Sequence, residues 1–231
     1  MTPAILAASS KSLFHFFQQG GFFMLLLVLC SVVSLAVIIL RGLALRRKTV
    51  MPPAIEEEIE NLKPGDAAES IVRLARLVRG DSSSLARIVL VCLRHLQWPK
   101  SENMEAVQTK ARHEIVNLES GLFILEVVVG IAPLLGLLGA VSGLVTVFAN
   151  LGDSSTVSDP RGLAKGISEA LSTTIVGLAI AIPSLIAYSY FTKKVETMSA
   201  EMESLSADLL AKCYYQKNRA ETRGELHIEG I

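Results

Sequence analysis

Long apolar stretches separated by polar segments dominate the pattern of the chain. Three of them, residues 22–40, 127–151 and 170–192, contain no Asp, Glu, Lys or Arg. Each is close to or longer than the roughly 20 residues that a helix needs to cross the hydrocarbon core of a bilayer. The pattern therefore predicts an all-α membrane protein whose three transmembrane helices cover residues 22–40, 122–151 and 160–192.

Between the first two spans, residues 41–121 show helical periodicity with one apolar face, which predicts a folded helical insertion. A capping box at Asp66–Glu69 and a glycine at Gly80 mark the two ends of one helix. The serine run at 82–84 precedes a second helix. Ser101 is expected to cap a third, which we expect to continue without a break into the second span.

The third transmembrane helix is expected to begin at Asp159–Pro160, an N-cap residue followed by proline. Past the membrane it continues as an extension over residues 193–217, and residues 218–231 form a polar, flexible tail. Apolar residues in this extension recur in steps of three and four, as in a coiled-coil seam. The seam has two interpretations, packing on the chain's own helices or contact between subunits. Its members are Val195, Met198, Met202, Leu205 and Leu209.

Basic residues flank the spans unevenly, and such residues stay on the cytoplasmic side. They follow the first and third spans, so the N-terminus is expected outside and the C-terminus inside. Residues 1–21 and 152–159 then form periplasmic segments, and residues 41–121 are cytoplasmic. A cleavable signal peptide is disfavoured because polar Gln18 and Gln19 precede a long apolar run. The orienting residues are Arg41, Arg46, Arg47, Lys48, Lys193 and Lys194.

Composition narrows the function classes. The chain of 231 residues is 51% hydrophobic and only 19% charged, which excludes a soluble globular enzyme. Its formal net charge of +0 gives no support for nucleic-acid binding. The 3 cysteines and 4 histidines have no metal-ligand spacing, and no catalytic motif is present. We therefore expect no enzyme activity, no catalytic residues, no metal and no cofactor.

Glu169 is the main candidate for chemistry, because a carboxylate at membrane depth is costly and usually functional. Thr173 and Thr174 follow one turn later, and their hydroxyls can pass on a proton or hold water. The structural alternatives are an ion pair between Glu169 and Lys165, and hydroxyls that bond carbonyls one turn earlier. Glu126 is interpreted as a solvated or paired carboxylate.

Small residues and prolines make the second and third spans suited to close packing. Glycines let helix backbones approach where no hydrophobic force drives association, and prolines inside a span free a carbonyl or kink the helix. Three spans with one deep acid cannot enclose a pore, but several copies could, with their carboxylates near the axis. The expected packing residues are Pro133, Gly136, Gly139, Gly143, Gly177 and Pro183.

Three motifs resemble the MotA/TolQ/ExbB proton-channel family, in its ExbB/TolQ branch. They are Ile131–Gly139 in the second span, and Gly166–Thr174 and Gly177–Pro183 in the third. The resemblance covers residues 13–215 and includes the three-span topology with the N-terminus outside. The sequence departs from the family at Ala140, where the family has threonine.

The resemblance implies a homopentamer in the bacterial inner membrane, with the second and third helices lining a central pore. The pore would hold a single-span partner of the ExbD/TolR type, and the transported ion would be H+. Proton flow would drive mechanical work across the envelope, through a TonB- or TolA-type protein. On this resemblance Glu169 is the pore glutamate, Thr174 is the helix-three threonine and Thr173 is an adjacent addition. The competing hypothesis is a structural membrane scaffold without ion conduction.

Overall fold

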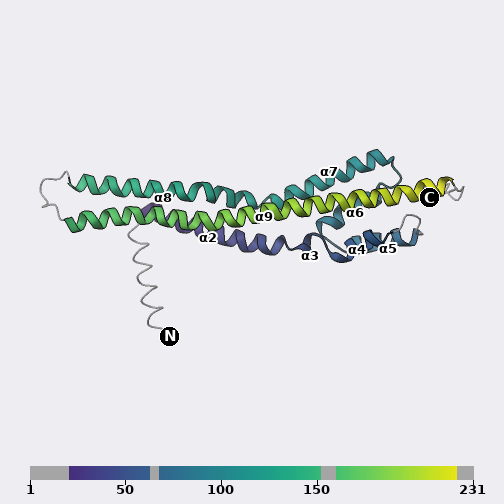
Figure 1. The fold of residues 1–231 in the computed structure, drawn as a ribbon, viewed down its shortest axis with the longest axis horizontal. Coiled ribbons are helices and arrows are strands. Elements are labelled where there is room, and N and C mark those ends of the chain that lie inside the picture. The colour runs from purple at the N-terminus through teal and green to yellow at the C-terminus, as the bar shows by residue number, and fades with distance from the viewer. Residues whose placement is uncertain (1–20, 63–67, 152–159, 223–231) are drawn as a thin grey trace, which may run out of the picture. The chain divides into compact units, whose positions relative to one another are not determined.

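The computed structural model describes residues 21–62, 68–151 and 160–222, and every regular element in those ranges is an α-helix (Figure 1). The expected cap residues Asp66 and Asp159 lie outside these ranges. The helices are α2 (Gly21–Ala44), α3 (Arg47–Val50), α4 (Pro53–Asn61), α5 (Ala68–Arg79), α6 (Ser84–Arg94), α7 (Lys100–Glu119), α8 (Leu122–Leu151) and α9 (Pro160–Thr222).

The chain divides into two compact units. Of the described residues, the three-span unit contains 21–40, 121–151 and 160–190, and the insertion unit contains 41–62, 68–120 and 191–222. Helix α9 contributes residues to both, because it is one continuous helix of 63 residues.

Within the described ranges, three helices are long and apolar enough to cross a membrane, as the sequence predicts. The qualifying segments are Phe22–Ala44 in α2, Leu122–Ala149 in α8 and Gly162–Tyr215 in α9, with mean hydropathies of 3.1, 2.4 and 2.0. The chain itself covers little of these helices, since only 17%, 33% and 28% of the most apolar windows are buried. The uncovered side chains are apolar, so they require lipid or other subunits around them.

The core of the three-span unit is small and contains residues from all three helices. Met24 and Leu27 of α2 are almost fully buried against Val128 and Ala132 of α8 and Ala181 of α9. Figure 1 shows α8 and α9 side by side, and their contacts run in antiparallel register.

In the insertion unit, helix α6 packs on both α5 and α7, and α4 packs on α5. Helix α6 begins where Ser83 Oγ accepts a hydrogen bond of 3.3 Å from the amide of Ala86, a cap that stabilises a helix by about 1 kcal/mol. The amphipathic pattern of α6 gives it one buried face. That face consists of Leu85, Ala86, Ile88, Val89 and Cys92.

Two boundary predictions are wrong. Ser101 does not cap α7, because the helix begins one residue earlier, at Lys100, and Pro99 is its N-cap residue without a side-chain bond. The third helix of the insertion also does not run unbroken into the second span: α7 ends at Glu119 and α8 begins at Leu122. At the break, Ser120 Oγ donates a hydrogen bond of 2.9 Å to the carbonyl of Asn117, and this side-chain bond competes with the backbone bonds that would continue the helix. The same Oγ accepts a hydrogen bond of 3.0 Å from Arg41.

The extension of α9 supplies apolar residues to the chain's own interior. Val195, Met198, Met202 and Leu209 are each at most 4% exposed, while Leu205 is partly buried. This burial within one chain favours intrachain packing, the first of the two interpretations of the seam. Near the end of the extension, Lys212 Nζ donates to the carbonyls of Ile59 and Glu60 at 2.9 and 3.1 Å, which satisfies the C-terminal end of α4.

Candidate functional site

Helices α8 and α9 meet along a seam of glycines at backbone distance. A Cβ atom placed on Gly177 would lie 2.6 Å from the carbonyl oxygen of Ala132. One placed on Gly136 would lie 2.9 Å from the carbonyl oxygen of Thr173. Both contacts are with backbone atoms, which cannot move aside by a change of side-chain rotamer. The close helix packing expected from the sequence is therefore present at these glycines.

The same seam extends towards the other end of the two helices. A Cβ on Gly139 would lie 3.0 Å from Thr173 Oγ1, and one on Gly143 would lie 2.9 Å from the Cβ of Ala170. A Cβ on Gly130, which lies between the start of α8 and these glycines, would have nothing within 4 Å. The close approach is thus confined to one part of the α8 face.

The two threonines of α9 converge on one carbonyl oxygen of α8. Thr173 Oγ1 lies 3.1 Å from the Gly136 oxygen and 2.7 Å from the Ala170 oxygen, and Thr174 Oγ1 lies 3.3 Å from the Gly136 oxygen. Because a hydroxyl has a single hydrogen, Thr173 shares one proton between a carbonyl of its own helix and a carbonyl of α8. Thr173 is buried, at 3% exposure.

Glu169 lies one turn before Thr173 on α9, and its side chain is 35% exposed in the single chain. Its Oε1 lies 3.7 Å from Lys165 Nζ, so the pairing considered from the sequence is present. The side chain of Lys165 is 68% exposed, and such a long, exposed pair is weak. The structure places Glu169 on the same helix as the threonines, without a hydrogen bond among the described residues that joins its carboxylate to either hydroxyl.

The other polar residues considered have ordinary surroundings. Ser172 Oγ donates to the carbonyl of Ser168 at 2.8 Å, one turn earlier. Glu126 is exposed near the start of α8. Ala140, the departure from the family pattern, is 6% exposed.

Both prolines lie inside their helices, Pro133 in α8 and Pro183 in α9. Each lacks an N–H, so a carbonyl one turn earlier loses its helical donor. Next to Pro183, Ser184 Oγ lies 2.7 Å from the carbonyl of Ile180 and 2.6 Å from Ser34 Oγ of α2.

The Ser34–Ser184 pair is a polar contact that the sequence reasoning missed. The two serines are 3% and 1% exposed, so the contact is buried between α2 and α9. The signal for it was present, because both serines stand in spans without charged residues, where a hydroxyl requires an internal partner. The sequence could not indicate that they would partner each other.

Outside the spans, three groups among the described residues have shifted pKa values: Glu114, Cys92 and Cys213. Burial raises the pKa of Glu114, but the hydrogen bond and charge of Lys110, together with Arg87, outweigh it, so the pKa of Glu114 is lowered. Lys110 Nζ lies 2.7 Å from Glu114 Oε1. Burial, with Cys213 nearby, raises the pKa of the Cys92 thiol to about 12. Among the described residues no group of His, Cys, Asp or Glu is arranged to hold a metal ion.

Comparison with known proteins identifies the family. A sequence-family model described as "MotA/TolQ/ExbB proton channel family" matches residues 82–204, which is more than half of the chain. The chain belongs to this family. The matched region contains α8 and the membrane-spanning part of α9, and with them the glycine seam and Glu169.

Named relatives place the chain in the ExbB branch. It is 30% identical over 186 residues to the putative biopolymer transport protein ExbB-like 1 of Synechocystis sp., covering 77% of this chain and 68% of that one. It is 26% identical over 202 residues to the biopolymer transport protein ExbB of Neisseria meningitidis serogroup A, covering 81% and 89%. A putative ExbB homolog of Methanothermobacter thermautotrophicus is 32% identical over 145 residues, covering 63% of this chain and half of that protein.

Proposed function

We propose that this chain is the proton-conducting stator subunit of an inner-membrane motor that uses the proton motive force to drive mechanical work across the cell envelope. The observation that carries the proposal is the isolation of Glu169. It is the only Asp, Glu, Lys or Arg between Lys165 and Lys193, on a helix long and apolar enough to span the membrane. A lone intramembrane carboxylate is a functional-site hypothesis by default.

In this proposal Glu169 takes up and releases the transported proton. Thr173 and Thr174 hold the neighbouring stretch of α9 against α8 through the Gly136 carbonyl. The glycine seam supports the same assignment, because it keeps α8 and α9 at a fixed distance around the acid. Rigid elements position a relay group better than mobile ones do.

The proposed assembly is a homopentamer whose α8 and α9 helices surround a pore. That pore holds a single-span partner of the ExbD/TolR type, linked to a TonB- or TolA-type protein. Support comes from the large uncovered apolar surface of the spans, and from relatives named as biopolymer transport proteins. One chain with a single deep acid does not enclose a pore by itself.

The proposed orientation places the N-terminus in the periplasm and the insertion unit in the cytoplasm. Its support is the group of basic residues that follows the first span, including Arg46, Arg47 and Lys48. A C-terminal fusion to a reporter that is active only in the cytoplasm tests it. Activity of a periplasm-specific reporter at that terminus would contradict the orientation.

The deciding experiment replaces Glu169 with glutamine, which keeps the size and polarity of the side chain but removes its charge. The complex of the chain and its co-expressed partner is reconstituted in liposomes, and proton uptake under an imposed potential is measured. We expect at least a tenfold loss for Glu169→Gln, the order expected when a proton-transfer group is removed, with the subunit number by native mass spectrometry unchanged.

The matched control is Glu126→Gln, an exposed carboxylate at the start of α8, which should retain proton uptake. Full uptake by Glu169→Gln would refute the relay role. Absence of uptake in the unmodified complex, with assembly intact, would favour the scaffold hypothesis instead.

A further inference from the structure

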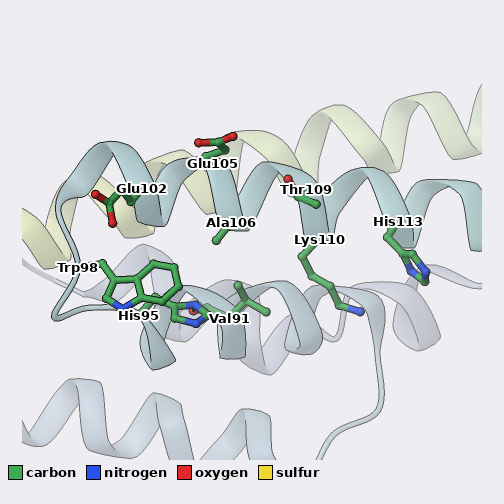
Figure 2. A pocket seen from close by; sticks show the side chains of 9 residues that line it. All are labelled: Val91, His95, Trp98, Glu102, Glu105, Ala106, Thr109, Lys110 and His113. Atoms are coloured by element: carbon green, nitrogen blue, oxygen red, sulfur yellow. The ribbon is translucent and has the colours of Figure 1, made fainter.

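An open groove of about 670 Å³ lies in the insertion unit, between the end of α6 and one face of α7 (Figure 2). Its volume is in the range typical of ligand sites. Nothing in the proposed proton pathway uses it. The groove has an aromatic wall, an acidic end and a basic end at Lys110, and each contributes to the inference.

The aromatic wall consists of Trp98 and His95, whose ring centroids are 4.0 Å apart. Trp98 is the only tryptophan of the chain and is 45% exposed, although it lies four residues after the end of the well-packed helix α6. His95 Nδ1 donates to the carbonyl of Val91 at 3.0 Å. In the neutral ring this bond leaves Nε2 as an acceptor. An exposed indole face beside an acceptor is suited to a cationic side chain.

The acidic end consists of Glu102 and Glu105, one turn apart on the α7 face that lines the groove. Both are exposed, and neither forms an ion pair with a side chain in the described part of the chain. The positive end of the helix dipole at the start of α7 stabilises a negative charge at Glu102. It does not explain the presence of Glu105 or the exposure of the indole.

At the other end, the ammonium group of Lys110 is already committed. Its Nζ lies 2.7 Å from Oε1 of Glu114, a carboxylate whose side chain is 1% exposed. Glu114 Oε2 also lies 3.3 Å from Arg87, so one carboxylate is shared by two cations. Among the residues that line the groove, the two carboxylates of Glu102 and Glu105 still outnumber the single ammonium group of Lys110, and the net charge of the lining is negative. A basic occupant complements it.

We propose that this groove binds a basic peptide segment, the cytoplasmic flank of a membrane-spanning partner protein. An arginine or lysine side chain would lie over Trp98 with its charge at Glu102, and a second basic side chain of the segment would reach Glu105, whose carboxylate points away from Trp98 (Figure 2). Because short cytoplasmic flanks of membrane proteins are enriched in Lys and Arg, such segments are available beside a cytoplasmic unit. The proposal rests on the proposed orientation, which places the insertion unit in the cytoplasm.

The test uses the full chain, purified in a zwitterionic detergent, and a fluorescein-labelled peptide of alternating arginine and glycine. Binding is followed by the anisotropy of the peptide. In a second titration with an unlabelled peptide, the fluorescence emission of Trp98 is measured. This emission reports on the groove alone because the chain has no other tryptophan. We expect saturable binding, a change in Trp98 emission, and little binding of an alternating glutamate–glycine peptide.

The variant Glu102→Gln/Glu105→Gln should weaken binding by about fivefold to tenfold, the combined effect expected for two exposed charge pairs. Trp98→Ala should weaken it by about threefold or more, as expected for the loss of a cation–π contact. The matched control is Glu57→Gln/Glu119→Gln, which removes two exposed carboxylates of the same unit outside the groove. It should bind as the unmodified chain does.

Equal weakening by the control would show general electrostatic attraction and would overturn the proposal. An unchanged Trp98 emission throughout the titration would also overturn it, as expected if a second subunit covers the groove. The titration involves no ion gradient. Its failure would therefore leave the relay role of Glu169 to be decided by proton uptake alone.

Discussion

Replacing Gly177 with alanine tests the packing of α8 against α9. The added Cβ would lie 2.6 Å from the carbonyl oxygen of Ala132 and 3.2 Å from the Cα of Gly136. Restoring an ordinary contact of 3.4 Å to the first of these requires a shift of about 0.8 Å. Overpacking of a well-packed interior costs about 1–3 kcal/mol. The shift also weakens the threonine bonds to the Gly136 carbonyl, which already measure 3.1 and 3.3 Å.

Alanine in place of glycine in a helix also contributes about 0.5–1 kcal/mol in favour of folding. The matched control is Gly130→Ala, because a Cβ at that helical position meets nothing within 4 Å. Relative to Gly130→Ala, the variant Gly177→Ala should therefore be less stable by the full overpacking cost of about 1–3 kcal/mol.

The assay is unfolding of the purified variants in mixed detergent micelles, followed by circular dichroism as the fraction of denaturing detergent is raised. The difference in unfolding free energy between the two variants is the measured quantity. Equal stability of Gly177→Ala and Gly130→Ala would refute the reasoning, because it would mean that α8 and α9 separate without cost.

Three further predictions concern buried polar groups. Ser184→Ala should destabilise the protein by about 0.6–2 kcal/mol, the range for hydrogen bonds between membrane helices, because it leaves Ser34 without its 2.6 Å partner; detergent unfolding measures this. The pKa of Glu114 is lowered on folding, so its contribution to stability is present above the unfolded pKa and is lost as the pH falls through the folded pKa. When the pH is lowered from neutral to acidic, the melting temperature of Glu114→Gln should fall less than that of the unmodified chain. Cys92 and Cys213, with pKa values raised to about 12 and about 11, should resist alkylation by iodoacetamide at neutral pH and react after denaturation.

Each of these has a result that would contradict it. The exposed Ser31 is the control for the serine pair, and equal effects of Ser31→Ala and Ser184→Ala would exclude a special contribution from the buried bond. A steeper fall of the melting temperature with acid in Glu114→Gln would contradict a lowered pKa of Glu114 in the folded protein. Rapid alkylation of Cys92 in the folded protein would show that its thiol is accessible and ionised.

The sequence predicts the helices well where one local signal dominates. The three spans follow from apolar runs without charged residues, and α6 follows from its amphipathic period with a serine at the start. The α7–α8 break was missed because Gly121 is a single glycine in a helical pattern, a feature that helices often tolerate. The contact between Arg41 and Ser120 at the break joins residues 79 positions apart, and local periodicity contains no information about such a pair.

In the candidate site, too, local sequence signals predict one part and miss another. Glu169 stands out by composition alone, but the meeting of Thr173 and Thr174 at one oxygen does not follow from the helical period. The two side chains point about 100° apart on α9. Only the backbone approach at Gly136 brings one acceptor within reach of both. That approach is a property of two helices together, and one helix considered alone cannot reveal it.

The glycine seam has a consequence for protein engineering. At Gly136 and Gly177 the neighbouring atoms are backbone, so each helix is shaped to the main chain of the other. Exchanging only α8 between related proteins would combine surfaces that did not evolve together. Chimaeras of this protein should therefore transfer α8 and the spanning part of α9 as one block, whereas an exchange of α2 must match the buried Met24 and Leu27 and the Ser34 contact.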